Sequence, residues 1–126
     1  MILFNGKPVK LTHKKCLVIY ISGGITGVEN WQNAFMAAEQ DLVQYLHAPF
    51  IIFNPVKIAK NLNYTFKIQK NKIPEYTDYM REDIKFLAKC NTICMLPGWK
   101  RSKGARLEYR IAKILNMQIL EFQPEL

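Results

Sequence analysis

The stretch from Leu96 to Ala112 combines residue types that could bind an anion and perform nucleophilic or acid–base chemistry. A strand end leads through a loop rich in Gly, Ser and Lys into a helix predicted over 103–115, with an expected buried stripe of Leu107, Ile111, Ile114 and Leu115. The free N–H groups and positive dipole end of a helix N-terminus favour an anionic ligand, and further charge comes from Lys100, Arg101 and Lys103. Glu108 lies one turn inside this helix, where it is either a solvated helical glutamate or a catalytic carboxylate.

Asp83 is a second carboxylate in a position that attracts attention. A helix predicted from Pro74 to about Lys89 has the apolar positions Tyr79, Met80, Ile84 and Leu87. Asp83 falls inside this apolar arc, on one line with Tyr79 and Leu87. A carboxylate on an inward face needs partners, or its pKa rises. Two interpretations stay open: Asp83 caps a neighbouring turn or pairs with a lysine, or it belongs to a functional site.

Alternating apolar runs and helical patterns predict the scaffold that positions these groups. The runs read as buried strands, of the kind found in parallel sheets, at Cys16–Ile21, Phe50–Phe53, Thr92–Leu96 and Met117–Phe122. Asn30 is expected to cap a helix whose apolar residues run from Trp31 to Leu46 at helical spacing. The pattern predicts a three-layer α/β domain with a mainly parallel sheet of four or five strands.

Ligands of such sheets bind beyond the carboxyl ends of the strands. The segments expected at that edge are Tyr20–Gly27, Asn54-Pro55 and Leu96–Lys103. The glycines after the first strand, in Ser22-Gly-Gly-Ile-Thr-Gly27, do not have the spacing of a dinucleotide-binding fingerprint or of a Walker A loop. An ordinary strand-to-helix turn explains these glycines as well as a ligand loop does.

Two segments have no clear pattern. Residues 1–15 contain apolar runs around Asn5-Gly6 and form either a hairpin or an N-terminal extension. Residues 56–75 are rich in Lys and Asn with interspersed Tyr64 and Phe66, and we expect a short helix followed by a lid-like loop. The alternative for this second segment is a basic aromatic surface for single-stranded nucleic acid.

The composition limits the remaining possibilities. A length of 126 residues predicts one domain spanning 1–126. The net charge of +8 indicates anionic partners or serves solubility. Cys16, Cys90 and Cys94 are expected to be reduced core thiols rather than a disulfide or a zinc site. No metal site, membrane span or secretion signal is expected, and the protein is expected to be cytoplasmic.

Three motifs resemble the nucleoside 2-deoxyribosyltransferase-like superfamily, most closely its small phage and bacterial members of the DUF4406 type. The motifs occur in the order of that family and cover about residues 16–122. They are VIYISGGITG at 18–27, MREDIKFLAKCN at 80–91 and LPGWKRSKGARLEYRIA at 96–112.

The resemblance implies a flavodoxin-like or Rossmann-like fold and an enzyme that cleaves or exchanges N-glycosidic bonds. By motif, Glu108 matches the nucleophilic glutamate, Asp83 the active-site aspartate that contacts or protonates the departing base, and Tyr20 a tyrosine that orients the nucleophile. The residues expected to bind the substrate are Gly23, Gly24, Thr26, Asn54, Ser102, Lys103 and Gly104. No cofactor is expected, and the resemblance implies a homodimer or a higher homo-oligomer.

The sequence departs from the family pattern in its first loop. Gly24 and Thr26 stand where relatives that hydrolyse nucleoside monophosphates often have Ser and Arg. Phosphate binding must then rest more on Ser102, Lys103, Gly23 and backbone amides. Arg106 and Arg110 flank Glu108 in sequence, and we expect them to lower its pKa.

Three functions follow, in order of preference. The first is a nucleotide or nucleoside N-glycosidase, or a 2-deoxyribosyltransferase, acting through a glycosyl ester of Glu108. The second is a protein that binds and sequesters a nucleotide without turning it over. Nucleic-acid binding through the Lys-rich segment ranks behind both.

Overall fold

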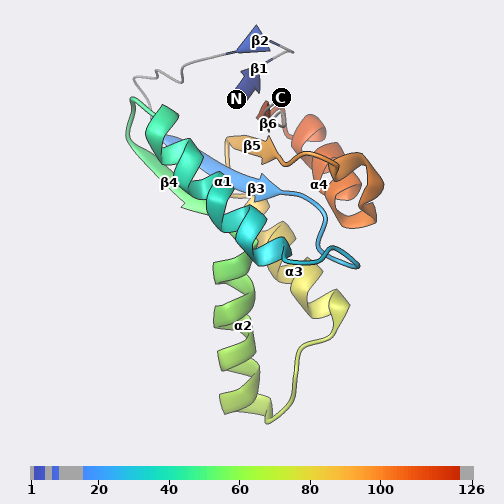
Figure 1. Ribbon diagram of the computed structural model, residues 1–126. Coiled ribbons are helices and arrows are strands. Elements are labelled where there is room, and N and C mark those ends of the chain that lie inside the picture. Colours follow the sequence, from blue (N-terminus) through green and yellow to red (C-terminus); the bar gives the residue numbers. More distant parts are fainter. Residues whose placement is uncertain (1, 5–6, 9–15, 123–126) are drawn as a thin grey trace.

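The computed structural model describes residues 2–4, 7–8 and 16–122 and contains a sheet with the strand order β2-β1-β6-β5-β3-β4 (Figure 1). Four of these strands run parallel to one another: β3 (Leu17–Ser22), β4 (Phe50–Phe53), β5 (Thr92–Met95) and β6 (Gln118–Phe122). Helices flank this parallel sheet on both faces. The prediction of a three-layer α/β, flavodoxin-like fold is confirmed.

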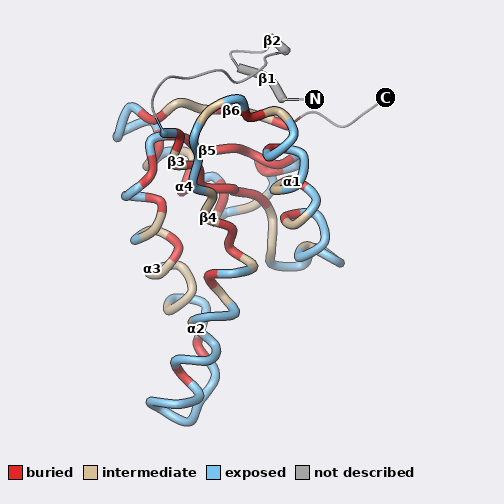
Figure 2. The backbone as a smooth tube through the Cα atoms, turned by 90° about the vertical axis from the view of Figure 1, so that its left-hand side faces the viewer, coloured by how far each residue is buried: buried red, intermediate tan, exposed pale blue. Residues whose placement is uncertain are grey.

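The two faces of β3 belong to different halves of the core. Because side chains alternate along a strand, Ile19 and Ile21 pack beneath α1 (Trp31–Tyr45) with Phe35 and Leu42. Tyr20 points to the opposite face, into a cluster covered by α3 (Tyr76–Leu87) and α4 (Lys103–Ile114). In Figure 2 the buried residues gather along the strands and on the inner sides of the helices. The strand therefore supplies one apolar face and one face that reaches α3 and α4.

Two details of the predicted elements differ. Asn30 precedes α1 as expected, but it adopts a left-handed conformation with φ 56° and its side chain makes no capping hydrogen bond. The prediction that Phe50–Phe53 is buried is wrong, because β4 is the edge strand and pairs only with β3. Phe50 and Ile51 are 39% and 49% exposed. Apolar sequence identifies the strand but not its place in the sheet.

The largest departure lies in residues 56–75. Instead of a short helix and a lid-like loop, the chain forms α2 (Pro55–Lys70), a helix of 16 residues. Asn54 caps it by accepting a hydrogen bond from the Val56 N–H, and proline at the first position suits a helix start. Ile58 packs into the core on the α3 and α4 side of the sheet, and Phe66 is buried further along the helix. Only residues 71–75 connect it to α3.

The N-terminal strands extend the sheet beyond β6. β1 (Ile2–Phe4) pairs antiparallel with both β2 (Lys7–Pro8) and β6. This pairing agrees with the hairpin alternative. The expected turn at Asn5-Gly6 and residues 9–15, which include His13, lie outside the described residues.

Candidate active site

The polar face of β3 ends in two hydroxyl groups that point at one carboxylate. The Tyr20 hydroxyl donates to Oε2 of Glu108 at 2.5 Å, and Oγ of Ser22 donates to Oε1 at 2.7 Å. All three side chains are buried. Tyr20 and Ser22 are two residues apart and therefore share a face of the strand. The expected meeting of Tyr20 and Glu108 is present, and it holds both oxygens of the carboxylate.

Glu108 is brought to the strand by a helix face of small residues. Ser102 caps α4, its side chain accepting from the Ala105 N–H. The buried residues of α4 are Ala105, Glu108 and Ala112, spaced three and four apart. The expected buried stripe is wrong, because Leu107 is 43% and Ile114 is 78% exposed. Small alanines let the helix approach the sheet closely, so the carboxylate reaches Tyr20 and Ser22.

Burial dominates the electrostatics of Glu108. Desolvation raises its pKa to about 7, while the hydrogen bonds from Tyr20 and Ser22 lower it. The expectation that Arg106 and Arg110 lower this pKa is wrong, because both arginines are exposed and neither contributes to the shift. The carboxyl group of Glu108 therefore exchanges its proton near neutral pH, and the two hydroxyls favour its ionised form.

Asp83 is the second buried acid of this region. It lies on the inward side of α3, a helix that begins with a capping box formed by Glu75 and Asp78. Desolvation raises the pKa of Asp83 to about 8, and the negative charges of Glu108 and Glu82 raise it further. Asp83 is therefore protonated at neutral pH. Pairing with a lysine was one interpretation of this residue, and no such pair occurs among the ion pairs of the described residues.

Tyr20 stays neutral between these acids. Desolvation raises the pKa of its phenol well above the ordinary value, and the charges of Glu108 and Asp83 raise it further. A neutral phenol keeps its proton and can donate a hydrogen bond to a carboxylate. Tyr20 is therefore suited to orient Glu108 and not to act as a base.

Both acids open into one cavity of about 420 Å³. The cavity lies at the carboxyl end of β3, the place where ligands bind in open α/β sheets. Its walls come from the β3–α1 loop, α2, α3 and the start of α4. The residues that line it are Gly23, Ile25, Thr26, Trp31, Pro55, Ala59, Asn63, Tyr76, Tyr79, Met80, Asp83, Ser102, Gly104, Ala105 and Glu108. We call it the carboxylate pocket.

The expected substrate-binding residues divide into two groups. Four of them line the carboxylate pocket together with both acids: Gly23, Thr26, Ser102 and Gly104. The other three lie elsewhere. Gly24 lines a neighbouring cavity, Lys103 is exposed and lines neither cavity, and Asn54 is fully buried. The Asn54 amide donates to the Phe35 carbonyl oxygen at 3.1 Å, so this residue ties α1 to the start of α2.

Close packing explains the glycine at the pocket wall. A Cβ atom on Gly23 would lie 2.9 Å from Cβ of Leu96, closer than real Cβ contacts. Leu96 is buried and follows β5. Gly23 therefore lets the first loop lie against the neighbouring strand end.

Sequence reasoning missed several residues of the pocket. Ser22 was seen only as part of a turn, although its spacing of two from Tyr20 places both on one strand face. Asn63 was missed because its segment was expected to be a short helix and a loop. Tyr79 was assigned to the helix predicted from Pro74 only as an apolar position, and Tyr76, in the same predicted helix, was not singled out. The hydroxyl of Tyr79 donates to Oδ1 of Asn63 and thereby links α3 to α2 at the pocket.

Other candidate sites have less support. Cys90 and Cys94 are buried as expected, whereas Cys16 is exposed, and all three are free thiols. Among residues 2–4, 7–8 and 16–122, no group of three or more His, Cys, Asp or Glu side chains could hold a metal ion. No helix within the same ranges has the length and apolar character needed to cross a membrane.

Comparison with known proteins gives a family but no activity. The model of a family described as "Domain of unknown function (DUF4406)" matches residues 17–121. This range runs from the start of β3 into β6 and includes every residue of the carboxylate pocket. No curated protein matches the chain.

Proposed function

Since the chain belongs to the DUF4406 family, whose description assigns no activity, we propose from the site itself that the protein cleaves the N-glycosidic bond of a nucleoside or nucleotide. One observation carries the proposal: the carboxylate of Glu108 is held by two hydroxyl donors in a pocket that also contains the protonated Asp83. Displacement at a sugar carbon needs this combination of an oriented carboxylate and an acid.

In the first step, Glu108 attacks the anomeric carbon of the sugar. A bond forms between a carboxylate oxygen and this carbon, while the bond from the carbon to the base nitrogen breaks and its electron pair leaves with the base. The protonated carboxyl of Asp83 gives its proton to the base. The hydroxyls of Tyr20 and Ser22 fix the attacking group in one orientation.

In the second step, the glycosyl ester of Glu108 is resolved. Water attacks the anomeric carbon, the ester bond breaks with its electron pair returning to Glu108, and the ionised Asp83 accepts the proton from water. The product is the free sugar or sugar phosphate. If a second base attacks instead, the same ester yields a new nucleoside, so one site supports both hydrolysis and transfer.

A substrate panel tests this proposal. Purified protein is incubated with nucleosides and 5′-monophosphates, with and without a second free base, and released or exchanged base is measured by chromatography. We expect base release from at least one substrate, with a covalent sugar adduct on the peptide that contains Glu108 in quenched samples. Glu108→Ala removes both signals, while Glu29→Gln, on an exposed residue outside the pocket, keeps them.

The panel also separates catalysis from sequestration. Thermal stabilisation by a nucleotide without base release would favour the non-catalytic binding protein over the enzyme. Base release that survives in Glu108→Ala would remove the nucleophile from the mechanism.

A further inference from the structure

The far end of α2 and its connection to α3 project from the body of the molecule. Figures 1 and 2 show this projection from two directions, and most of its residues are exposed, with Phe66 and Pro74 as buried exceptions. With 16 residues, α2 is about 24 Å long at 1.5 Å per residue. We call residues 60–74 the arm. Packing of the domain core does not explain why a helix extends so far into solvent.

The charge of this segment has one sign. Between Pro55 and Pro74 the sequence has five lysines and no Asp or Glu. Lys57 pairs with Glu39 at 2.7 Å, on the body side of the arm. Among the described residues, the other four lysines form no ion pair: Lys60, Lys67, Lys70 and Lys72. The arm therefore presents a basic surface with no internal compensation, which fits a polyanion.

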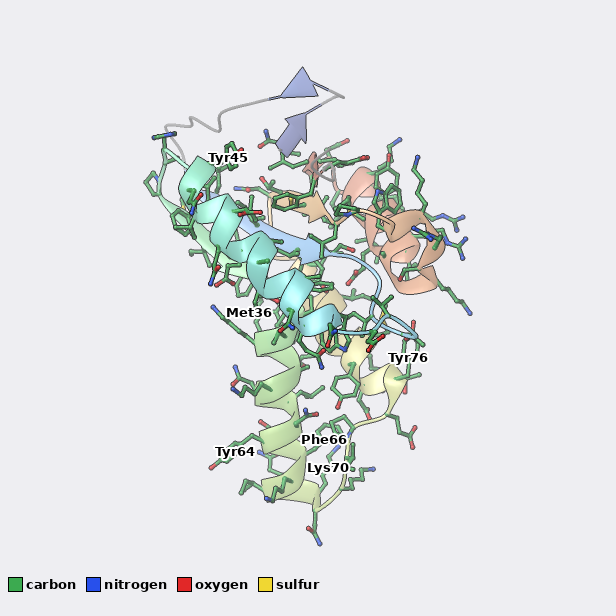
Figure 3. All side chains as sticks on the ribbon, in the orientation of Figure 1. Met36, Tyr45, Tyr64, Phe66, Lys70 and Tyr76 are labelled. Carbon is green, nitrogen blue, oxygen red and sulfur yellow. The ribbon has the colours of Figure 1, made fainter. Side chains whose placement is uncertain are left out.

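The basic surface continues one wall of the carboxylate pocket. Pro55, Ala59 and Asn63 line the pocket from α2 at intervals of four residues, and Lys67 and Lys70 follow on the same line of the helix. Figure 3 shows Lys70 and Phe66 on the side of α2 that faces the return to α3, with Tyr64 on the opposite side. Nζ of Lys70 lies 4.5 Å from the centre of the Phe66 ring.

An exposed aromatic ring stands on the facing side of the pocket. Tyr76 at the start of α3 lines the pocket, yet it is 55% exposed. Its hydroxyl lies 3.5 Å from the position that a Cβ atom on Gly104 would occupy. The ring therefore spans from α3 towards the start of α4, with one part in the pocket and one part in solvent. Such a ring can stack on a base.

We propose that the arm binds single-stranded nucleic acid and that the nucleotide delivered to Glu108 is part of such a strand. The claim that this strand is a substrate rests on the proposed function. Backbone phosphates follow Lys67 and Lys70, a base stacks on Tyr76, and the neighbouring nucleotide enters the pocket. The sequence ranked nucleic acid last, because it did not reveal that the lysines lead to the buried acids.

Other polyanions fit these features less well. An acidic protein would satisfy the lysines but presents no sugar to Glu108 and has no need for a stacking ring. A second copy of this arm carries the same positive charge and is repelled. Duplex nucleic acid is disfavoured because Glu108 is only 5% exposed, and a paired base cannot reach a buried group without leaving its stack.

Binding is tested with Glu108→Gln, which removes turnover. Fluorescence anisotropy follows labelled homopolymers of one to twelve nucleotides and a matched duplex at several salt concentrations. We expect affinity to rise with length over the first several nucleotides and to exceed that for the duplex by at least tenfold. Adding Lys67→Glu and Lys70→Glu weakens binding at least tenfold and reduces the salt slope by about 1.4, the value for two phosphates of a single strand.

A matched charge change elsewhere is the control. Lys89 and Lys113 are exposed, lie over Phe86 and Tyr109 as Lys70 lies over Phe66, and line neither cavity. We expect Lys89→Glu with Lys113→Glu to change the affinity less than threefold. This control separates the effect of charge in the arm from the effect of the protein's total charge. Tyr76→Leu weakens binding at least fivefold, because it removes the stacking face. Lysines near a helix C-terminus also stabilise the helix, so charge reversal could lower the melting temperature. In that case Lys67→Gln with Lys70→Gln repeats the binding test without adding negative charge.

Two measurements distinguish the failure of this inference from the failure of the proposed function. With active protein, the Lys67→Glu, Lys70→Glu variant lowers the ratio of oligonucleotide to mononucleotide kcat/KM at least tenfold. A ratio that does not change, length-independent binding, or equal binding of the duplex overturns the inference while base release still supports the enzyme. Tight, arm-dependent strand binding with no base release from any substrate overturns the proposed function and the substrate claim, and leaves the binding surface.

Discussion

Two cavities lie on either side of the loop after β3, and they differ both in volume and in the carboxylates that line them. The neighbouring cavity is the larger, at about 740 Å³ against about 420 Å³, and is lined largely by glycines, alanines and apolar residues of α1 and of the turn after β5. Its one carboxylate, Asp41, is exposed. The carboxylate pocket instead contains two buried acids.

The difference originates in the alternation of β3. Ile19 and Ile21 face α1, whereas Tyr20 and Ser22 face the other side and hold Glu108. Thr26 and Ser102 line both cavities, so a single loop and a single helix start lie between the pocket with the two buried acids and the larger cavity. Volume alone would select the larger cavity, although the two buried acids line the smaller one.

The strongest test of this comparison removes one carboxylate from each cavity. Glu108→Gln keeps the size of the side chain and removes the nucleophile, so kcat/KM should fall at least about a thousandfold. Asp41→Asn makes the same chemical change in the larger cavity and should alter kcat/KM less than twofold. Both variants are measured on the best substrate of the panel. A comparable loss in Asp41→Asn would move the reaction to the larger cavity.

Removing the hydroxyl donors should have the next largest effect. Each hydroxyl stabilises the ionised form of Glu108, so Tyr20→Phe or Ser22→Ala raises its pKa above about 7. We expect kcat/KM at pH 7 to fall about 10- to 100-fold, the usual range for a hydrogen bond to a charged group, and the rising limb of the pH profile to move to higher pH. Tyr109→Phe, on a tyrosine stacked against Trp99, is the matched control and should leave the profile in place.

The comparison also shows which parts of the site could be predicted. Continuous apolar runs located β3 and β5, because a strand that is buried on both faces consists mostly of apolar residues. Motif matching placed Glu108 and Asp83, and the fold brought them to one pocket. The order of the elements was sufficient to predict the sheet edge at which the pocket lies.

The sequence-based predictions failed where the buried residues of a helix are not its apolar residues. On α4 the apolar Leu107 and Ile114 face outward, while alanines and a glutamate face the sheet. Periodicity analysis assumes the reverse. On α2 the many Lys and Asn residues concealed the inward positions Ile58 and Phe66. The pKa of Glu108 was misjudged because adjacent arginines in a helix sequence point away from it, and burial decides the shift.

Asp83 should make the stability of the protein depend on pH. Its pKa of about 8 in the folded state lies above the ordinary value of 3.8, so the folded state binds more protons than the unfolded state between these pH values. The free energy of unfolding therefore falls as pH rises from about 4 to 8, by up to about 1.4 kcal/mol per pH unit for one proton. Asp83→Asn removes this proton and flattens the curve, which gives a gain of about 2 kcal/mol or more at pH 8.

Urea unfolding at a series of pH values measures this effect. The curves for the wild type and for Asp83→Asn should approach each other below about pH 3, where the aspartic acid is protonated in both states, and diverge above it. Glu108 has a raised pKa as well, so part of the slope remains in the variant. Parallel curves across the whole range would show that Asp83 is not buried as an acid.

The smallest expected effect concerns the loop that divides the two cavities. A Cβ on Gly23 meets Cβ of the buried Leu96 at 2.9 Å. The closest atom to a Cβ on Gly24 is the end of the half-exposed Val28 at 3.1 Å, and Cβ of Ser102 follows at an ordinary contact distance of 3.8 Å. Neither glycine has a positive φ, so packing alone separates them. Gly23→Ala should lower the free energy of unfolding by about 1–3 kcal/mol, the cost of an overpacked site, and shift the loop at the carboxylate pocket. Gly24→Ala should cost less than about 0.5 kcal/mol, because the Val28 side chain can move into solvent. Urea unfolding of the two single variants measures the contrast, and equal costs would mean that the division between the cavities does not depend on the contact of Gly23 with Leu96.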